Sequence, residues 1–167
     1  DKTILVIDVG NTNTVFALVN NDGIYHKWRM STSVNRTSDE YETHISAYLS
    51  KISNFKIDDV VISSVVPSIN YELQSFVLRF FNIIPKLVGD TIHPNIDISL
   101  ERPDEVGADR LVNSLAANKI YGGPIIVVDF GTATTFDIVS KEGIYIGGII
   151  SPGVYLSMDA LDKATAR

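Results

Sequence analysis

The sequence predicts an α/β protein made of two related lobes, each with a mixed sheet flanked by helices, and three observations lead to this prediction. Short apolar runs typical of buried strands alternate with longer segments of helical spacing. The stretch VIDVGNTNTVFALVNNDGIY from Val6 is repeated as VVDFGTATTFDIVSKEGIY from Val127. Each copy carries an Asp-x-Gly turn after an apolar strand, which favours one topology used twice.

The first lobe is expected to begin with a meander of hairpins and to continue with alternating helices and strands. Asn20-Asn21-Asp22-Gly23 is a turn signal between the second and third strands. Thr37 or Ser38 is the expected N-cap of the first helix. A continuous apolar run at 59–66 is typical of a central parallel strand. The expected elements are strands at 3–9, 14–19 and 24–30, a helix at 37–52, a strand at 59–66, a helix at 67–81, a strand at 84–88 and a helix at 103–121.

The second lobe is expected to begin where Gly122-Gly123-Pro124 ends the long helix. We place the first lobe at 1–121, ending in the helix that bears a Gly-Ala-Asp-Arg segment, and the start of a truncated second lobe at 122–167. The elements expected there are strands at 125–129, 136–139 and 144–150 and a helix at 155–164.

The internal repeat matches seven positions of the two copies in the same order. Any two buried hairpins share some likeness, because Val, Ile, Asp and Gly suit such turns, but ordered matches favour duplication. In this alignment one residue is dropped in the turn before Gly23 and Gly143. The other matches are Asp8 with Asp129, Gly10 with Gly131, Asn11 with Thr132, Thr14 with Thr135, Ile24 with Ile144 and Tyr25 with Tyr145.

The two Asp-x-Gly turns have the composition of a phosphate site. A carboxylate that follows a buried strand lies at the rim of a sheet, and the glycine allows a ligand to approach the backbone. The small hydroxyl and amide side chains that follow can hold phosphate oxygens together with backbone N–H groups. An Asp beside phosphate implies a bridging cation, for which Mg²⁺ is suited. A tight hairpin turn with a satisfied Asp is the alternative, and neither turn is a Walker motif.

The segment from Pro103 to Arg110 is a third candidate. Pro103 suits a first helical turn, and Gly107 is expected inside the helix, where it would cost about 1 kcal/mol relative to Ala. Such a residue suggests the close approach of a ligand or another backbone. Asp109 could accept a proton from a substrate hydroxyl, and Arg110 could bind a carboxylate or phosphate. On spacing alone, an ordinary amphipathic helix is the favoured interpretation.

Four motifs in one order, DVGNTNT, RPDEVGADR, DFGTATTFD and GGIISPG, resemble those of the type III pantothenate kinases. These enzymes belong to the acetate and sugar kinase/Hsp70/actin superfamily. The resemblance implies duplicated actin-like (ribonuclease H-like) lobes and a homodimer. It implies ATP-dependent phosphorylation of pantothenate to 4′-phosphopantothenate, the first step of coenzyme A biosynthesis. It also implies Mg²⁺ and a monovalent cation, K⁺ or NH₄⁺, as cofactors.

The resemblance implies roles for particular residues. Asp109 would be the general base and Arg110 would contact the substrate carboxylate, with Asp129 and Asp8 at the metal ions. Leu100 stands where many members of the family carry a Tyr that lines the pantothenate pocket. The residues implied to bind pantothenate are Gly107, Ala108, Asp109, Arg110 and Leu100, and those implied to bind the nucleotide are Asp8, Val9, Gly10, Asn11, Thr12, Asn13, Thr14, Val15, Gly131 and Thr132.

Composition narrows the function classes. A formal net charge of −6 without a basic run argues against nucleic-acid binding. The absence of cysteine excludes disulfide scaffolds and thiol nucleophiles and fits a cytoplasmic protein. We expect no membrane span, because no apolar stretch reaches about 18 residues, and no signal peptide, because the first residues run straight into a strand.

Three alternatives stay open at this point. The chain could be a non-catalytic regulatory relative with the same fold, another small-molecule kinase or an exopolyphosphatase of the superfamily, or an interaction module. Its length of 167 residues is short for the family, which suggests a fragment that could be inactive as it stands. The segment RPDEVGADR favours the pantothenate branch of the superfamily.

Overall fold

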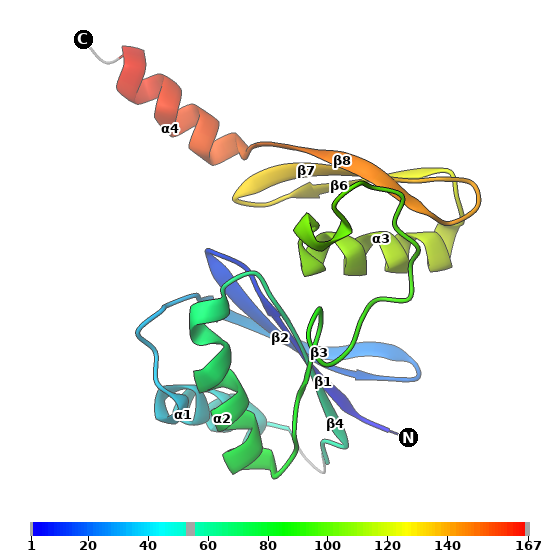
Figure 1. The fold of residues 1–167 in the computed structure, drawn as a ribbon. Helices are drawn as coiled ribbons and strands as arrows, with labels where there is room; N and C mark the ends of the chain where they lie inside the picture. The colour runs from blue at the N-terminus through cyan, green and yellow to red at the C-terminus, as the bar shows by residue number, and fades with distance from the viewer. Residues whose placement is uncertain (1, 53–55, 166–167) are drawn as a thin grey trace. The chain divides into compact units, whose positions relative to one another are not determined.

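The computed structural model describes residues 2–52 and 56–165, so the last two residues of the predicted second lobe lie outside the description. Its elements fall into two units, Asp1–His93 and Pro94–Arg167 (Figure 1). The boundary predicted from the sequence lies instead after residue 121. The difference concerns α3 (Ala108–Tyr121), which packs on strands of the second unit.

The first unit is built on a five-stranded mixed sheet in the order β3-β2-β1-β4-β5. β1, β2 and β3 form the predicted antiparallel meander, and β4 pairs with β1 in parallel, which confirms the predicted central strand. β5 is shorter than the strand expected at 84–88. The strands are β1 (Ile4–Val9), β2 (Asn13–Asn20), β3 (Gly23–Ser31), β4 (Asp59–Ser64) and β5 (Lys86–Leu87).

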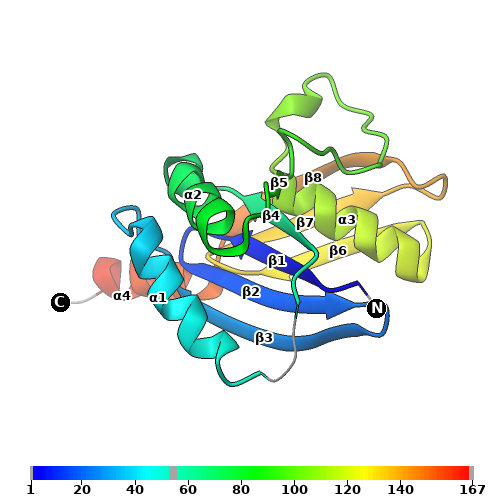
Figure 2. The same ribbon diagram turned by 90° about the horizontal axis from the view of Figure 1, so that it is seen from below.

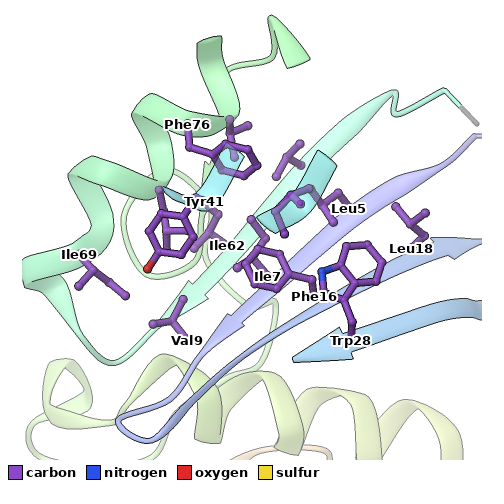
Figure 3. Close-up of a cluster of buried hydrophobic side chains, with 14 of the residues drawn as sticks. Leu5, Ile7, Val9, Phe16, Leu18, Trp28, Tyr41, Ile62, Ile69 and Phe76 are labelled. Carbon is purple, nitrogen blue, oxygen red and sulfur yellow. The ribbon is translucent and has the colours of Figure 1, made fainter. Parts of the chain in front are cut away.

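Two helices, α1 (Ser38–Leu49) and α2 (Asn70–Phe81), contribute to the core of this unit. Thr37 caps α1: its side chain accepts from the Glu40 backbone N–H while the Glu40 carboxylate accepts from the Thr37 N–H at 2.8 Å. α2 follows a short 3₁₀ turn at Pro67–Ile69. Figure 3 shows Tyr41 and Phe76 from the helices above Ile7 and Ile62 from the strands. Each such fully buried side chain stabilises the fold by about 1.5–3 kcal/mol.

The second unit contains an antiparallel sheet in the order β6-β7-β8 (Figure 2). Helix α3 contacts β6 and β7, and α4 (Val154–Thr165) follows β8. The strands are β6 (Ile125–Phe130), β7 (Ala133–Val139) and β8 (Tyr145–Pro152). Among the described residues, no helix is both long and apolar enough to cross a membrane.

The start of α3 corrects one prediction. Pro103–Glu105 forms a separate 3₁₀ turn, Val106 is extended, and α3 begins only at Ala108. Gly107 is therefore the N-cap residue, with φ −57° and ψ 141°, and does not lie inside a helix. The prediction was wrong because the chain between Pro103 and Tyr121 has continuous helical composition, which conceals a single extended residue.

Strand register corrects the alignment of the two copies. Gly10 N–H donates to the Asn13 carbonyl at 2.9 Å, whereas Gly131 N–H donates to the Ala133 carbonyl at 3.0 Å. The second copy is thus one residue shorter in the Asp-x-Gly turn and not in the following turn. Thr12 then matches Thr132, Thr14 matches Thr134, and Phe16 matches Phe136. Both copies also shift register at equivalent positions, Leu18/Val19 and Ile138/Val139, which supports duplication.

Candidate functional site

The first Asp-x-Gly turn joins β1 to β2. Asp8 ends up with an exposed side chain at the rim of the sheet, between Val15 on β2 and Ser63 on β4. Asn11, Thr12 and Asn13 are exposed in the turn that follows. Gly10 lies close to its own loop, because a Cβ there would come within 3.3 Å of the Asn13 carbonyl oxygen. The turn therefore presents one carboxylate and three small polar side chains together.

Two residues predicted to bind the nucleotide have side chains that point elsewhere. Val9 is 1% exposed and belongs to the hydrophobic core, so it could offer a ligand only its backbone. Thr14 is fully buried, and its hydroxyl is 2.9 Å from that of Thr32. Thr32 in turn donates to the Gly10 carbonyl at 2.7 Å. The hydroxyl of Thr14 thus holds the turn in shape and does not face solvent.

The second turn joins β6 to β7 and repeats the arrangement. Asp129, Gly131 and Thr132 are all exposed. Gly153 N–H donates to the Thr132 carbonyl at 3.1 Å, as Thr32 N–H does to the Thr12 carbonyl at 2.9 Å. A Cβ on Gly153 would overlap the carbonyl oxygens of Gly131 and Thr132. Glycine in the GGIISPG segment therefore allows the chain after β8 to close against the turn.

Asn113 connects this turn to helix α3. Its side-chain amide donates to Asp129 Oδ2 at 3.3 Å. Asn113 stands four residues after Asp109 and so shares a helix face with it. Asn113 was not among the predicted site residues, although its spacing from Asp109 could have indicated it. The contact links α3, which carries the predicted base Asp109, to the turn that carries the predicted metal-binding residue Asp129. Both belong to the second unit.

The amino end of α3 carries Gly107 and the predicted base, Asp109. No side chain caps it, and the N–H groups of Gly107, Ala108 and Asp109 come before the first hydrogen bond of the helix, which Arg110 N–H donates to the Gly107 carbonyl at 3.1 Å. Asp109 is half-buried in the first turn. A Cβ on Gly107 would come within 2.6 Å of Asp109 Oδ1, so the glycine leaves room for this carboxylate. A substrate hydroxyl and an anionic group could both be held at such an end.

The side chain of Arg110 is bound by another residue of the chain, Asp137. Its Nε donates to Asp137 Oδ1 at 2.8 Å, and Tyr145 donates its hydroxyl to the same oxygen at 2.7 Å. Burial, followed by the hydrogen bond to Asp137, raises the pKa of Tyr145 to about 12. The sequence prediction did not include Asp137 as the partner of Arg110 or Tyr145 as the partner of Asp137. The signal was the repeat itself, in which Asp137 stands where the first copy has Ala17.

Leu100 lies near the same group of residues. Its side chain is 38% exposed, and its Cδ2 would be 3.7 Å from a Cβ on Gly147. The segment that carries Leu100 runs beside β8, because Ser99 N–H donates to the Tyr145 carbonyl at 2.9 Å. Leu100, α3 and Asp137 therefore belong to one unit, whereas Asp8 to Val15 belong to the other.

The donor set suits a loosely held hard cation. Among the described residues, no cluster of three or more His, Cys, Asp or Glu side chains could hold a metal ion. Asp129 and Asp8 each offer a single exposed carboxylate. Mg²⁺ fits such a donor, because it keeps several waters and is commonly held by one or two carboxylates plus substrate phosphates.

A hollow on the first unit lies apart from these residues. Its volume is about 370 Å³, and it follows α2 and the chain that leads to β5. Its lining is Tyr71, Gln74, Ser75, Leu78, Ile84 and Pro85. None of the predicted site residues is among them, so the hollow adds nothing to the chemistry of the two turns.

Similar solved structures show the fold of the chain. The ethanolamine utilization protein EutJ from Carboxydothermus hydrogenoformans matches with a TM-score of 0.56 and 13% identity, over 98% of this chain and 57% of that chain. The Ppx/GppA phosphatase from Aquifex aeolicus, type II variant, matches with a TM-score of 0.57 and 17% identity, over 98% of this chain and 55% of that chain. These are proteins of the actin-like ATPase fold, which confirms the predicted fold class.

Sequence comparison narrows the class to one family. The family model described as type III pantothenate kinase matches residues 4–167, and the chain belongs to this family. The type III pantothenate kinase of Rhodospirillum rubrum is 50% identical over 167 residues, which cover 98% of this chain and 65% of the relative. That of Caulobacter vibrioides is 46% identical over 166 residues, which cover 98% and 64%. The chain thus spans 64–65% of the length of these relatives.

Proposed function

We propose that the protein containing this chain transfers the γ-phosphoryl group of ATP to the primary hydroxyl of pantothenate. Membership of the family supports the proposal. The structural observation that carries it is the hydrogen bond from Asn113 to Asp129, because it links the helix of the predicted base to the predicted phosphate turn. A phosphotransferase needs these two parts side by side, since its catalysis rests on positioning and charge stabilisation.

Asp109 is the proposed general base. As the pantothenate hydroxyl oxygen bonds to the γ-phosphorus and the bond from phosphorus to the ADP oxygen breaks, the hydroxyl proton passes to the Asp109 carboxylate. The half-buried position of Asp109 beside Gly107 supports this role. Gly107, Ala108, Arg110 and Leu100 line the proposed pantothenate pocket. Leu100 stands where many members of the family carry a Tyr, so the pocket lacks the hydroxyl of that Tyr.

Each of the two turns is a proposed phosphate-binding segment. The exposed side chains of Asn11, Thr12, Asn13 and Thr132 and the amides of Gly10 and Gly131 would contact phosphate oxygens, while Val9, Thr14 and Val15 shape the first turn. Asp8 and Asp129 would hold cations through their exposed carboxylates. Bound Mg²⁺ would supply neutralisation of the charge that develops on the transferred phosphoryl group. We further propose K⁺ or NH₄⁺ at Asp129, a homodimer, and a cytoplasmic location.

A coupled assay of the full-length protein tests the proposal. The protein is incubated with ATP, Mg²⁺ and K⁺ or NH₄⁺, with and without pantothenate, and ADP and phosphorylated product are measured. We expect pantothenate-dependent release of ADP. Release with sugars alone would favour another kinase of the superfamily. No release from a folded full-length protein would favour a regulatory relative.

Asp109→Asn provides the residue-level test. Loss of a positioned base should lower kcat by about 10²–10⁴-fold, because Asn cannot accept the proton. Asp104→Asn is the matched control, since Asp104 is exposed on the preceding 3₁₀ turn, and it should keep full activity. Full activity in Asp109→Asn would remove Asp109 as the base.

A further inference from the structure

The side chain of Arg110 lies in a buried group of polar side chains and not on an exposed helix surface. Nε and Nη2 of Arg110 lie 2.8 Å and 2.6 Å from Asp137 Oδ1, and the Tyr145 hydroxyl lies 2.7 Å from it. Only 14% of the Arg110 side chain and 2% of the Asp137 side chain are exposed. Three donors from α3 and β8 therefore converge on one buried carboxylate oxygen of β7.

A buried group of this kind adds little to the stability of the fold. Desolvation of two buried charges offsets most of their attraction, so an apolar pair of similar volume is often as stable. The first copy of the hairpin illustrates this point, because Ala17 occupies the position of Asp137, and Tyr25, which matches Tyr145, is 39% exposed. The hairpin fold therefore does not require the carboxylate.

The strand beside this group is shaped to admit the guanidinium. Gly148 pairs with Asp137 across the sheet. A Cβ on Gly148 would overlap Arg110 Nη2 and the Phe136 carbonyl and would come within 2.7 Å of Asp137 Oδ1. Glycine is thus needed for the arginine to reach its partner.

Nη2 of Arg110 is enclosed within this group. It is buried and lies 2.6 Å from Asp137 Oδ1, so Nη2 and Nε both contact the carboxylate of Asp137. The guanidinium is therefore held through two of its three nitrogens.

We infer that Asp137 and Tyr145 are positioning residues that hold Arg110 for the carboxylate of the substrate. The inference rests on the proposed function. Asp137 neutralises the charge of Arg110, so recognition depends on the direction of its remaining N–H groups and not on a diffuse positive field. Tyr145 holds Asp137 in turn. Without this support the guanidinium loses its orientation, and a carboxylate is no longer preferred over a neutral amide.

Substrate selectivity in the full-length protein separates positioning from a structural role. The measurement is kcat/KM for pantothenate divided by kcat/KM for the analogue whose carboxylate is replaced by a primary amide. We expect Asp137→Asn to lower this ratio about tenfold, because it loosens a charge-assisted hydrogen bond. Tyr145→Phe, which keeps the ring, should lower it by a smaller factor. Asp22→Asn in an exposed turn is the control and should leave the ratio unchanged.

The outcomes distinguish this inference from the proposed function. In the Arg110→Gln background, Asp137→Asn should lower the ratio no further. A structural role would lower both kcat/KM values together, and an unchanged ratio in folded Asp137→Asn and Tyr145→Phe proteins would overturn the inference alone. A wild-type protein that neither phosphorylates pantothenate nor binds it in calorimetry would overturn the inference and the proposed function together.

Discussion

The two copies of the Asp-x-Gly hairpin carry the same apolar pattern with opposite burial. Four positions that are at most 1% exposed in the first copy are between 37% and 76% exposed in the second. The residues remain apolar in both copies, although the side chains differ. The four pairs are Leu5 and Ile126, Ile7 and Val128, Val9 and Phe130, and Phe16 and Phe136.

The difference shows that the hairpin has one face for packing and one for chemistry. In the first unit, α1 and α2 cover the packing face. In the second unit, α3 lies on the other face, where Asp129 and Asp137 meet Asn113 and Arg110. The strand pattern thus specifies which face is apolar, while the neighbouring helices decide whether it is buried.

Removal of one aromatic ring from each copy should give the largest contrast. Phe16→Ala should lower the free energy of unfolding by about 3–5 kcal/mol, because it empties a fully packed site. Phe136→Ala should cost about 1 kcal/mol or less in these 167 residues, since Phe136 is 37% exposed. Urea denaturation of both variants measures the contrast. Equal losses would mean that the packing face of the second copy is covered in solution.

The carboxylates of the two turns should be equally necessary for turnover. Asp8→Asn and Asp129→Asn should each lower kcat about 100-fold in the full-length protein, because each removes a charge that holds a cation. Titration with Mg²⁺ and with K⁺ should then separate the two copies. We expect a weaker response to Mg²⁺ in Asp8→Asn and a weaker response to K⁺ in Asp129→Asn. Unchanged turnover in either variant would contradict the proposed role of that carboxylate.

Sequence patterns predicted the elements of both copies better than the environment of their side chains. Strand and helix identity follows from local periodicity, so the meander of the first thirty residues and the parallel strand β4 were predicted correctly. The burial of Thr14 was not, because its partner Thr32 lies 18 residues further on and only the sheet brings them together. The one-residue shift between the copies likewise needed strand register, which composition does not specify.

Site residues that the two copies share were predictable from the sequence, and those that only one copy carries were not. Asp8 and Asp129 stand at equivalent, exposed positions, as the alignment of the copies predicted. Asp137 departs from the repeat, and its pairing with Arg110 depends on how α3 packs against β7. Gly107 was misplaced for a local reason, since one extended residue at Val106 separates the 3₁₀ turn from α3.

Alkaline pH should distinguish Tyr145 from its counterpart Tyr25. The pKa of Tyr145 is raised from 10 to about 12, so the folded protein holds this proton more tightly than the unfolded chain. The resulting stabilisation is complete below pH 10 and is lost as the pH rises from 10 to 12. Tyr145→Phe should therefore lose less stability over this interval than the wild type in urea denaturation. Tyr25→Phe, with an exposed ring, is the control, and an identical pH dependence in all three proteins would contradict this prediction.

The beginnings of α1 and α3 offer the smallest contrast, between a helix end with a capping box and one without a side-chain cap. Thr37→Ala should lower the free energy of unfolding by about 1 kcal/mol, because it removes the side-chain oxygen of a capping box. It should leave the KM for pantothenate unchanged, since the cap lies in the other unit from α3. Gly107→Ala should do the reverse: its methyl group displaces the Asp109 carboxylate, so kcat falls while urea denaturation changes little. If Thr37→Ala changed the KM for pantothenate, the proposal that the amino end of α3 specifically holds the substrate would be contradicted.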